Sequence, residues 1–137
     1  MTTRSFAEVL RSGKFIVTAE LNPPKGTNLA PLLAHAERLR DVVDAFNLTD
    51  SHSLRMTMAP LAVARLLVER GIEPILQVNC RDPNRLALQS DLLGAYALGI
   101  RNILCMTGDP PRVGDHPDAK PVFDLDALGL MRAVATL

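Results

Sequence analysis

The chain repeats one pattern four times at a nearly constant interval. Four short runs are rich in β-branched and aliphatic residues. Each ends at or just before a residue whose side chain could take part in chemistry, namely Glu20, Asp50, Cys80 and Asp109. These residues are 30, 30 and 29 positions apart (50−20, 80−50, 109−80). A strand, loop and helix recurring every ~30 residues is the βαβ unit, which builds parallel sheets. Because active sites form at the carboxyl ends of such strands, we expect the four residues at the functional face.

The sequence between these residues predicts the individual elements. Ser5 to Glu8 has the form of a capping box and predicts a short helix ending at Gly13. Strands are predicted at 15–19, 42–49, 75–78 and 103–106. Helices are predicted along the apolar face 29–39, from Pro60 toward Arg70, from an Asp82 cap through Tyr96 to a left-handed Gly99, and from an Asp124 cap to Leu137. The proline-rich stretch 110–122 is predicted to be a functional loop.

The composition excludes several functional classes. With 47% hydrophobic residues, 22% charged residues and zero formal net charge, the chain lacks the basic surface that nucleic-acid binding needs. One Tyr and no Trp provide no stacking platform for bases. No apolar run approaches the ~20 residues of a membrane span, and the first residues lack a signal-peptide pattern. We therefore expect a cytoplasmic enzyme that contacts neither nucleic acid nor membrane.

Metal binding is not expected. Two cysteines cannot make a four-thiolate zinc site, and Cys105 is predicted to be a small buried apolar residue of the fourth strand. His52 and His116 fall in predicted loops without HxH or HExxH spacing.

The length of the chain suggests half of a closed barrel. Four βα units fill 137 residues, whereas a (β/α)8 TIM barrel needs ~250. We therefore expect residues 1–137 to be one partial domain without an internal boundary, namely the amino-terminal half of a TIM barrel. Such a half exposes strand edges and an apolar inner face, so we expect a homo-oligomer or a second chain that completes the barrel.

Four segments carry a family resemblance. FIVTAELNPPKG, NLTDSHSLRM, ILQVNCRDPNRLALQSDLLGA and ILCMTGDPP, in this order and spacing, resemble the amino-terminal half of the methylenetetrahydrofolate reductase family, over nearly the whole chain. NLTD makes them most similar to the type associated with anaerobic and corrinoid one-carbon pathways. The resemblance implies a flavin enzyme that uses FAD to reduce 5,10-methylenetetrahydrofolate to 5-methyltetrahydrofolate, as in methionine biosynthesis. Its implied electron donor is NAD(P)H or a low-potential donor acting through a partner subunit.

The resemblance also implies roles for single residues. Glu20 matches the family's catalytic glutamate, which would protonate a folate nitrogen, and Asp109 matches the catalytic aspartate near flavin and pterin. The implied cofactor contacts are Thr49, Asp50, Gln77, Asn79, Thr107, Gly108, Asp109, Phe123 and Asp126.

This sequence departs from the family pattern at two of these contacts. Gln77 replaces a flavin-site histidine, and Thr107 replaces an arginine that reaches the cofactor phosphates. Arg81 could compensate for the missing arginine, although we favour a surface charge for it.

Other interpretations of the same residues stay open. Glu20 could cap a helix or pair with an arginine, GDPP after Thr107 is a good turn sequence, and Phe123 could pack onto the start of the last helix. Another TIM-barrel enzyme is an alternative, such as a metal hydrolase using Asp50, His52, Asp109 and His116. A non-catalytic half-barrel that binds or supports a partner is the alternative from a different class.

Overall fold

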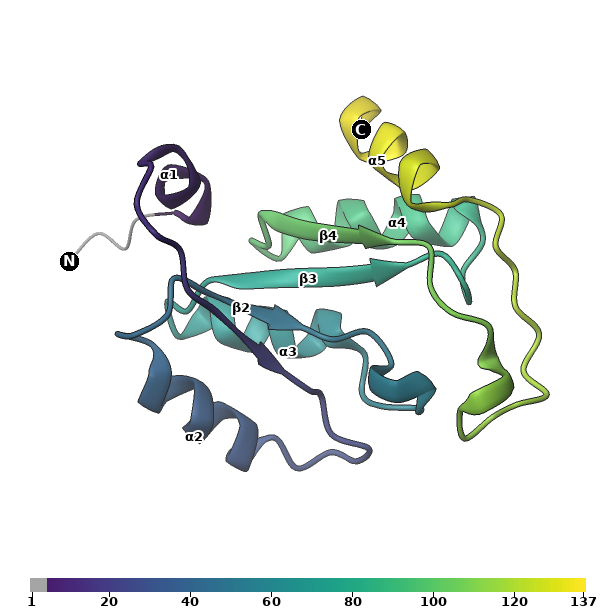
Figure 1. The fold of residues 1–137 in the computed structure, drawn as a ribbon, viewed down its shortest axis with the longest axis horizontal. Coiled ribbons are helices and arrows are strands. Elements are labelled where there is room, and N and C mark those ends of the chain that lie inside the picture. The colour runs from purple at the N-terminus through teal and green to yellow at the C-terminus, as the bar shows by residue number, and fades with distance from the viewer. Residues whose placement is uncertain (1–4) are drawn as a thin grey trace.

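The four predicted strands form one parallel sheet. The computed structural model describes residues 5–137. The strands are β1 (Thr18–Leu21), β2 (Ala45–Leu48), β3 (Pro74–Asn79) and β4 (Asn102–Met106). They pair in the order β1-β2-β3-β4, so each strand lies beside its neighbours in sequence. Figure 1 shows all four arrowheads pointing toward the same group of loops.

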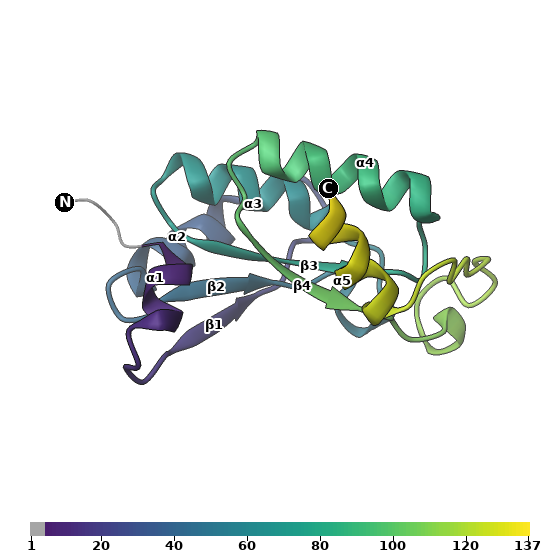
Figure 2. The ribbon, with the colours of Figure 1, turned by 90° about the horizontal axis from the view of Figure 1, so that it is seen from above.

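Helices follow the strands in the predicted order. They are α1 (Phe6–Arg11), α2 (Ala30–Leu39), α3 (Pro60–Glu69), α4 (Arg85–Ala97) and α5 (Ala127–Thr136), with short 3-10 helices η1 (His52–Leu54) and η2 (Pro111–Val113). Figure 2 shows α3 and α4 along one face of the sheet. Sequential parallel strands with their crossover helices on one face are the arrangement of barrel units, whereas a doubly wound sheet reverses its strand order. No helix within residues 5–137 is long and apolar enough to cross a membrane.

The sheet register follows the sequence repeat. Asn47 of β2 lies opposite Glu20 on one side and opposite Ile75 on the other, and Ile75 lies opposite Asn102. These steps are 27, 28 and 27 residues (47−20, 75−47, 102−75). The near-constant step confirms the predicted α/β fold of repeated strand and helix units.

The core is divided between the two faces of the sheet. Phe46 and Leu48 are buried against α2 and α3, whose Ala36 and Leu67 belong to the same apolar cluster. A second cluster joins α4 and α5 beside β4; it contains Cys80, Leu88, Leu92 and Leu130. On the opposite face, Phe6 of α1 packs on Ala45 and Ile75 where the strands begin. Since successive strand residues alternate between faces, Glu20 and Gln77 lie on the same face as Ala45 and Ile75, nearer the carboxyl ends of the strands.

The first strand begins later than predicted. The prediction of 15–19 is wrong for its first part, because Phe15 is 90% exposed and pairing starts at Thr18. Asp44 explains the shift: its backbone N–H donates to the Val17 carbonyl at 2.7 Å and its carboxylate accepts from the Val17 N–H at 3.0 Å. These two hydrogen bonds lie just before the first paired residues of the strands, so the apolar residues that precede Val17 are outside the sheet. The second strand was predicted from residue 42, and it also begins later, because its pairing starts at Ala45, just after Asp44.

Two predicted helix caps are wrong and two other start signals are confirmed. Asn84, not Asp82, caps α4, and Asp126, not Asp124, caps α5 by accepting from the Gly129 N–H at 2.7 Å. In both cases the rejected aspartate pairs with an arginine instead. The Ser5 capping box and the helix start at Pro60 are confirmed.

Candidate functional site

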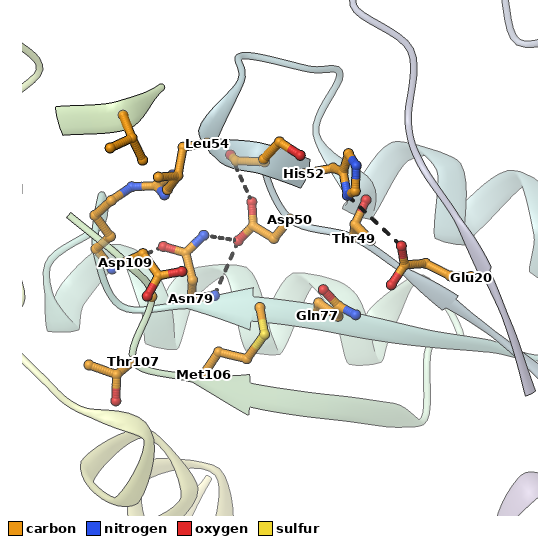
Figure 3. A pocket seen from close by; sticks show the side chains of 15 residues that line it. Glu20, Thr49, Asp50, His52, Leu54, Gln77, Asn79, Met106, Thr107 and Asp109 are labelled. Carbon is orange, nitrogen blue, oxygen red and sulfur yellow. Dashed lines mark hydrogen bonds and ion pairs between the residues drawn. The ribbon is translucent and has the colours of Figure 1, made fainter. Parts of the chain in front are cut away.

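A cavity of about 730 Å³ lies at the carboxyl ends of the strands (Figure 3). The structure brings most of the predicted site residues together in its wall. They are Glu20, Thr49, Asp50, Gln77, Asn79, Thr107, Gly108 and Asp109. His52, Leu54, Arg81, Met106 and Val113 also line the cavity. The loops after three different strands therefore contribute to a single site.

Glu20 faces the cavity from β1. Its neighbours Ala19 and Leu21 pack into the core, so strand alternation directs Glu20 to the other face. Its Oε1 lies 3.9 Å from Nδ1 of His52, and both side chains are about half exposed. Within the described residues Glu20 caps no helix, and it lies beside a histidine rather than an arginine. The carboxyl group is thus accessible to a ligand and to water.

Asp50 is occupied by neighbouring protein groups. Its Oδ2 accepts hydrogen bonds from the Asn79 backbone N–H at 3.1 Å and from the Asn79 side-chain amide. Oδ1 of Asn79 in turn accepts from the Arg81 N–H at 2.9 Å. Burial raises the pKa of Asp50, and the hydrogen bond from the Asn79 backbone opposes that rise. These hydrogen bonds join Asp50 to Arg81 along the floor of the cavity, and the sequence patterns did not predict them.

Two predicted cofactor contacts hold the loops through their hydroxyl groups. Thr49 is 5% exposed, and its Oγ1 donates to Oδ1 of Asn22 at 2.8 Å, which joins the ends of β1 and β2. Oγ1 of Thr107 accepts from the Ala127 N–H at 3.0 Å, which fixes the start of α5 beside β4. Each hydroxyl therefore has a structural partner while its residue borders the cavity.

Gly108 allows the chain to turn sharply at the end of β4. Its φ is +89°, and an added Cβ would lie 3.1 Å from Cβ of Arg81 and 3.3 Å from Cβ of Asn79. Only glycine fits such a left-handed and crowded position without strain. The turn leaves Asp109 exposed at the mouth of the cavity, opposite the Glu20 side (Figure 3).

Arg81 is not the surface charge that we favoured from the sequence. It is 6% exposed, and its Nε and Nη2 each donate to the Asp82 carboxylate at 2.7 Å, a contact that raises the pKa of Arg81. Its carbonyl accepts from the Val122 N–H at 2.6 Å, so the segment before α5 covers it. The long loop returning after β4 buries the guanidinium in the cavity wall, and no local sequence signal indicates this.

Phe123 and Asp126 lie outside the wall of the cavity. Asp126 serves as the cap of α5, and Phe123 has a left-handed φ of +45° with its N–H directed at the Arg81 carbonyl at 3.4 Å. The alternative in which Phe123 is the staple at the helix start is wrong, because Asp126 rather than Asp124 is the cap. Leu125 precedes the cap, and it packs against the cluster that contains Leu130.

The charges of the cavity favour a ligand with hydrogen-bond donors. Glu20, Asp50 and Asp109 place carboxyl groups in the wall, while the Arg81 guanidinium there is already paired with Asp82. Carboxylates accept hydrogen bonds only, so ring N–H and amino groups suit this wall better than phosphate oxygens. Within residues 5–137, no three His, Cys, Asp or Glu side chains are grouped to hold a metal ion.

Comparison with known families agrees with this geometry. The model of the family described as methylenetetrahydrofolate reductase matches residues 5–136. A comparison with curated proteins finds no match. The family match covers all four strands and every residue that lines the cavity. The chain belongs to the methylenetetrahydrofolate reductase family.

Proposed function

We propose that this chain forms part of a flavin-dependent enzyme that reduces 5,10-methylenetetrahydrofolate to 5-methyltetrahydrofolate. Family membership supports an oxidoreductase of this type. The observation that carries the proposal is the meeting of Glu20 and Asp109 in one cavity, although they lie on the first and fourth strand ends. An accessible acid and a hydrogen-bond acceptor across one cleft are what a folate reduction requires.

The size of the cavity supports the proposal that it holds the ring of a flavin such as FAD. Ligand sites typically have volumes of about 300–1,000 Å³, and this cavity has about 730 Å³. Gly108 presents backbone where any side chain would collide with the wall. Gln77, Thr107, Gly108 and Asp109 would hold the ring, and the proposal leaves Phe123 and Asp126 out because they lie elsewhere. When bound in its reduced form, the flavin supplies the hydride.

Glu20 would deliver the proton that the reaction needs. Reduction opens the bridge between the two folate nitrogens: one carbon–nitrogen bond breaks, the released nitrogen takes a proton, and the bridging carbon takes the hydride. The Glu20 carboxyl group is half exposed in the cavity, where it can reach a bound ring as a general acid. Asp109 would accept a hydrogen bond from the pterin amino group and so orient the substrate.

We infer that the four units belong to a (β/α)8 barrel, as the family implies. In the described residues, β1 and β4 are the two ends of the sheet, and their outer edges have no strand partner. Parallel strands with open edges tend to pair further. The remaining strands would come from another part of the protein or from a second chain, including a second copy. Native mass spectrometry tests the second source, because a lone 14.9 kDa species with one cooperative thermal transition contradicts it.

The electron donor is a further part of the proposal. We propose NADH, NADPH or a low-potential donor acting through a partner subunit, and the NLTD sequence supports the type associated with corrinoid pathways. Steady-state reduction of the bound flavin by each donor separates these choices, since only the physiological donor should give rapid bleaching of the flavin absorbance.

The cofactor proposal is tested by reconstitution. Protein purified and incubated with FAD is freed of excess ligand, its visible spectrum is recorded, and the flavin released by heat is identified by chromatography. We expect a bound flavin spectrum and recovery of FAD. Folded protein that retains neither FAD nor FMN would overturn the proposed function, and a tightly bound metal in its place would favour the hydrolase.

A further inference from the structure

The loop after β4 closes onto the loop after β2 at one glycine. A Cβ on Gly114 would lie 2.0 Å from the Leu54 carbonyl oxygen and 2.8 Å from the Leu54 Cβ. The two backbones are therefore in direct contact, which no other residue type at Gly114 permits. Beside this contact, the Asp115 N–H donates to the same Leu54 oxygen at 3.3 Å.

Asp115 joins these two loops to a third. Its Oδ1 accepts from the Met56 N–H at 3.0 Å, and its Oδ2 accepts from Nζ of Lys25 at 2.6 Å. Lys25 follows β1, and in the same region the Met58 N–H donates to the Pro24 carbonyl at 2.8 Å. The loops after β1, β2 and β4 thus meet at one carboxylate. The hydrogen bonds from Lys25 and the Met56 N–H hold the pKa of Asp115 below its usual value.

The segment held by these contacts has an unfavourable backbone. Ser51, Ser53 and Leu54 have φ values of +57°, +53° and +57°, a region that residues with side chains rarely adopt. Such conformations persist only where the surrounding structure fixes them, and they are common at binding sites. Here the segment forms the cavity wall and places His52 3.9 Å from Glu20.

We propose that Gly114 and Asp115 form a clasp that holds residues 51–54 against the cavity, which makes Asp115 a positioning residue for the ligand bound between Glu20 and Asp109. The identity of that ligand, a flavin or folate ring, rests on the proposed function. The clasp itself rests only on the contacts between the three loops. Without it the left-handed residues relax, His52 moves away from Glu20, and the wall opens to water.

Hydrogen exchange followed by mass spectrometry tests the clasp without any ligand. Asp115→Ala should speed exchange in peptides covering 51–58 by about tenfold or more, with peptides of β3 unchanged. Asp115→Asn should give a smaller increase, because its amide oxygen still accepts from the Met56 N–H. Asp118→Ala, at an exposed position of the same loop, is the matched control and should leave exchange unaltered. Unchanged exchange at 51–58 in Asp115→Ala overturns the clasp.

Gly114→Ala provides a second and independent probe. Its Cβ cannot be accommodated against Leu54, so the same peptides should lose protection. Gly26→Ala is the control, because nothing lies within 4 Å of the added atom. Equal protection in these two alanine variants contradicts the close contact.

Ligand affinity tests the positioning role. Asp115→Ala should weaken FAD binding about tenfold and raise the KM for the folate while kcat changes less than threefold, since it removes no group that touches the reacting atoms. Faster exchange at 51–58 with wild-type affinity and KM overturns the positioning role. If neither the wild type nor the Asp118→Ala control binds FAD, the proposed function fails, and the exchange data still decide whether the clasp exists.

Discussion

Gly108→Ala should destabilise the protein by an amount that the local geometry sets. The φ of +89° costs an L-residue about 1–2 kcal/mol. The added Cβ also meets Arg81 at 3.1 Å and Asn79 at 3.3 Å, and such overpacking costs about 1–3 kcal/mol. The lower entropy of the unfolded alanine chain returns about 0.4–1 kcal/mol. We therefore expect a net loss of about 1–5 kcal/mol in the free energy of unfolding.

Two other glycines separate the two causes. Gly13 has a φ of +73° but nothing within 4 Å of an added Cβ, so Gly13→Ala should show the backbone cost alone, about 1 kcal/mol. Gly26 has neither constraint, and Gly26→Ala should be neutral or stabilising by up to about 1 kcal/mol. Urea unfolding followed by circular dichroism gives the three values, provided that the m-value is unchanged. If Gly108→Ala costs no more than Gly13→Ala, the crowding of Gly108 against the cavity floor is wrong.

Three further outcomes follow from single carboxyl groups. Glu20→Gln should slow reoxidation of the reduced flavin by methylenetetrahydrofolate by roughly 10²-fold in rapid mixing, while flavin reduction by the donor is nearly unchanged; a wild-type reoxidation rate would exclude the general acid. Asp50 has a raised pKa, so its ionisation opposes folding as pH rises above about 3.8. Asp50→Asn should therefore reduce the decrease in melting temperature that accompanies this rise in pH. Asp124 has its pKa lowered to about 2 by Arg85, so it stabilises the fold above about pH 3.8 and loses this effect as pH falls toward 2. Asp124→Asn should remove that acid-dependent loss in melting temperature, and an unchanged pH profile would mean that the Arg85 contact does not form in solution.

The periodicity of the sequence predicted the fold well because each unit closes locally. A strand, a helix and the next parallel strand require only the 3.6-residue and two-residue patterns, and the sheet order follows the chain. The errors in the element boundaries occur where contacts with residues distant in the sequence determine the boundary. The residues before Thr18 are as apolar as those of a strand, yet Phe15 faces solvent because no neighbouring strand pairs with it.

A distant partner explains one of the two wrong caps, and an adjacent residue explains the other. Asp82 and Asp124 each suit a helix start by local rules, but each accepts from an arginine instead, and Arg85 lies 39 residues from Asp124. A bidentate guanidinium contact is stronger than a single backbone donor, so the next polar residue takes the cap. Local sequence carries no sign of the Arg85 contact, whereas Arg81 directly precedes Asp82 in the chain.

The positions of the strand ends predicted which residues line the cavity. They did not predict the hydrogen bonds between those residues. The rule that functional groups follow parallel strands correctly grouped Glu20, Asp50 and Asp109 from their sequence positions alone. It was wrong for Cys80, which is fully buried in the cluster with Leu88 and does not line the cavity. The rule did not distinguish a side chain that is free to contact a ligand from one that already hydrogen-bonds to another protein group, as Asn79 does. Nor did it predict the buried Arg81, because that depends on how the long loop after β4 returns over the sheet.

Two carboxyl groups on neighbouring strands illustrate how environment divides roles. Asp50 is largely withdrawn from water, and both donors of Asn79 are spent on one of its oxygens, so its contribution is to hold the ends of β2 and β3 together. Glu20 is half exposed, and its Oε1 lies 3.9 Å from the His52 Nδ1, so its oxygens are available to a bound ring. Pairs of acids in contrasting surroundings commonly separate a structural group from a proton-transferring one. Substitution at Asp50 should therefore change stability as a function of pH, whereas substitution at Glu20 should change the folate half-reaction with little effect on stability.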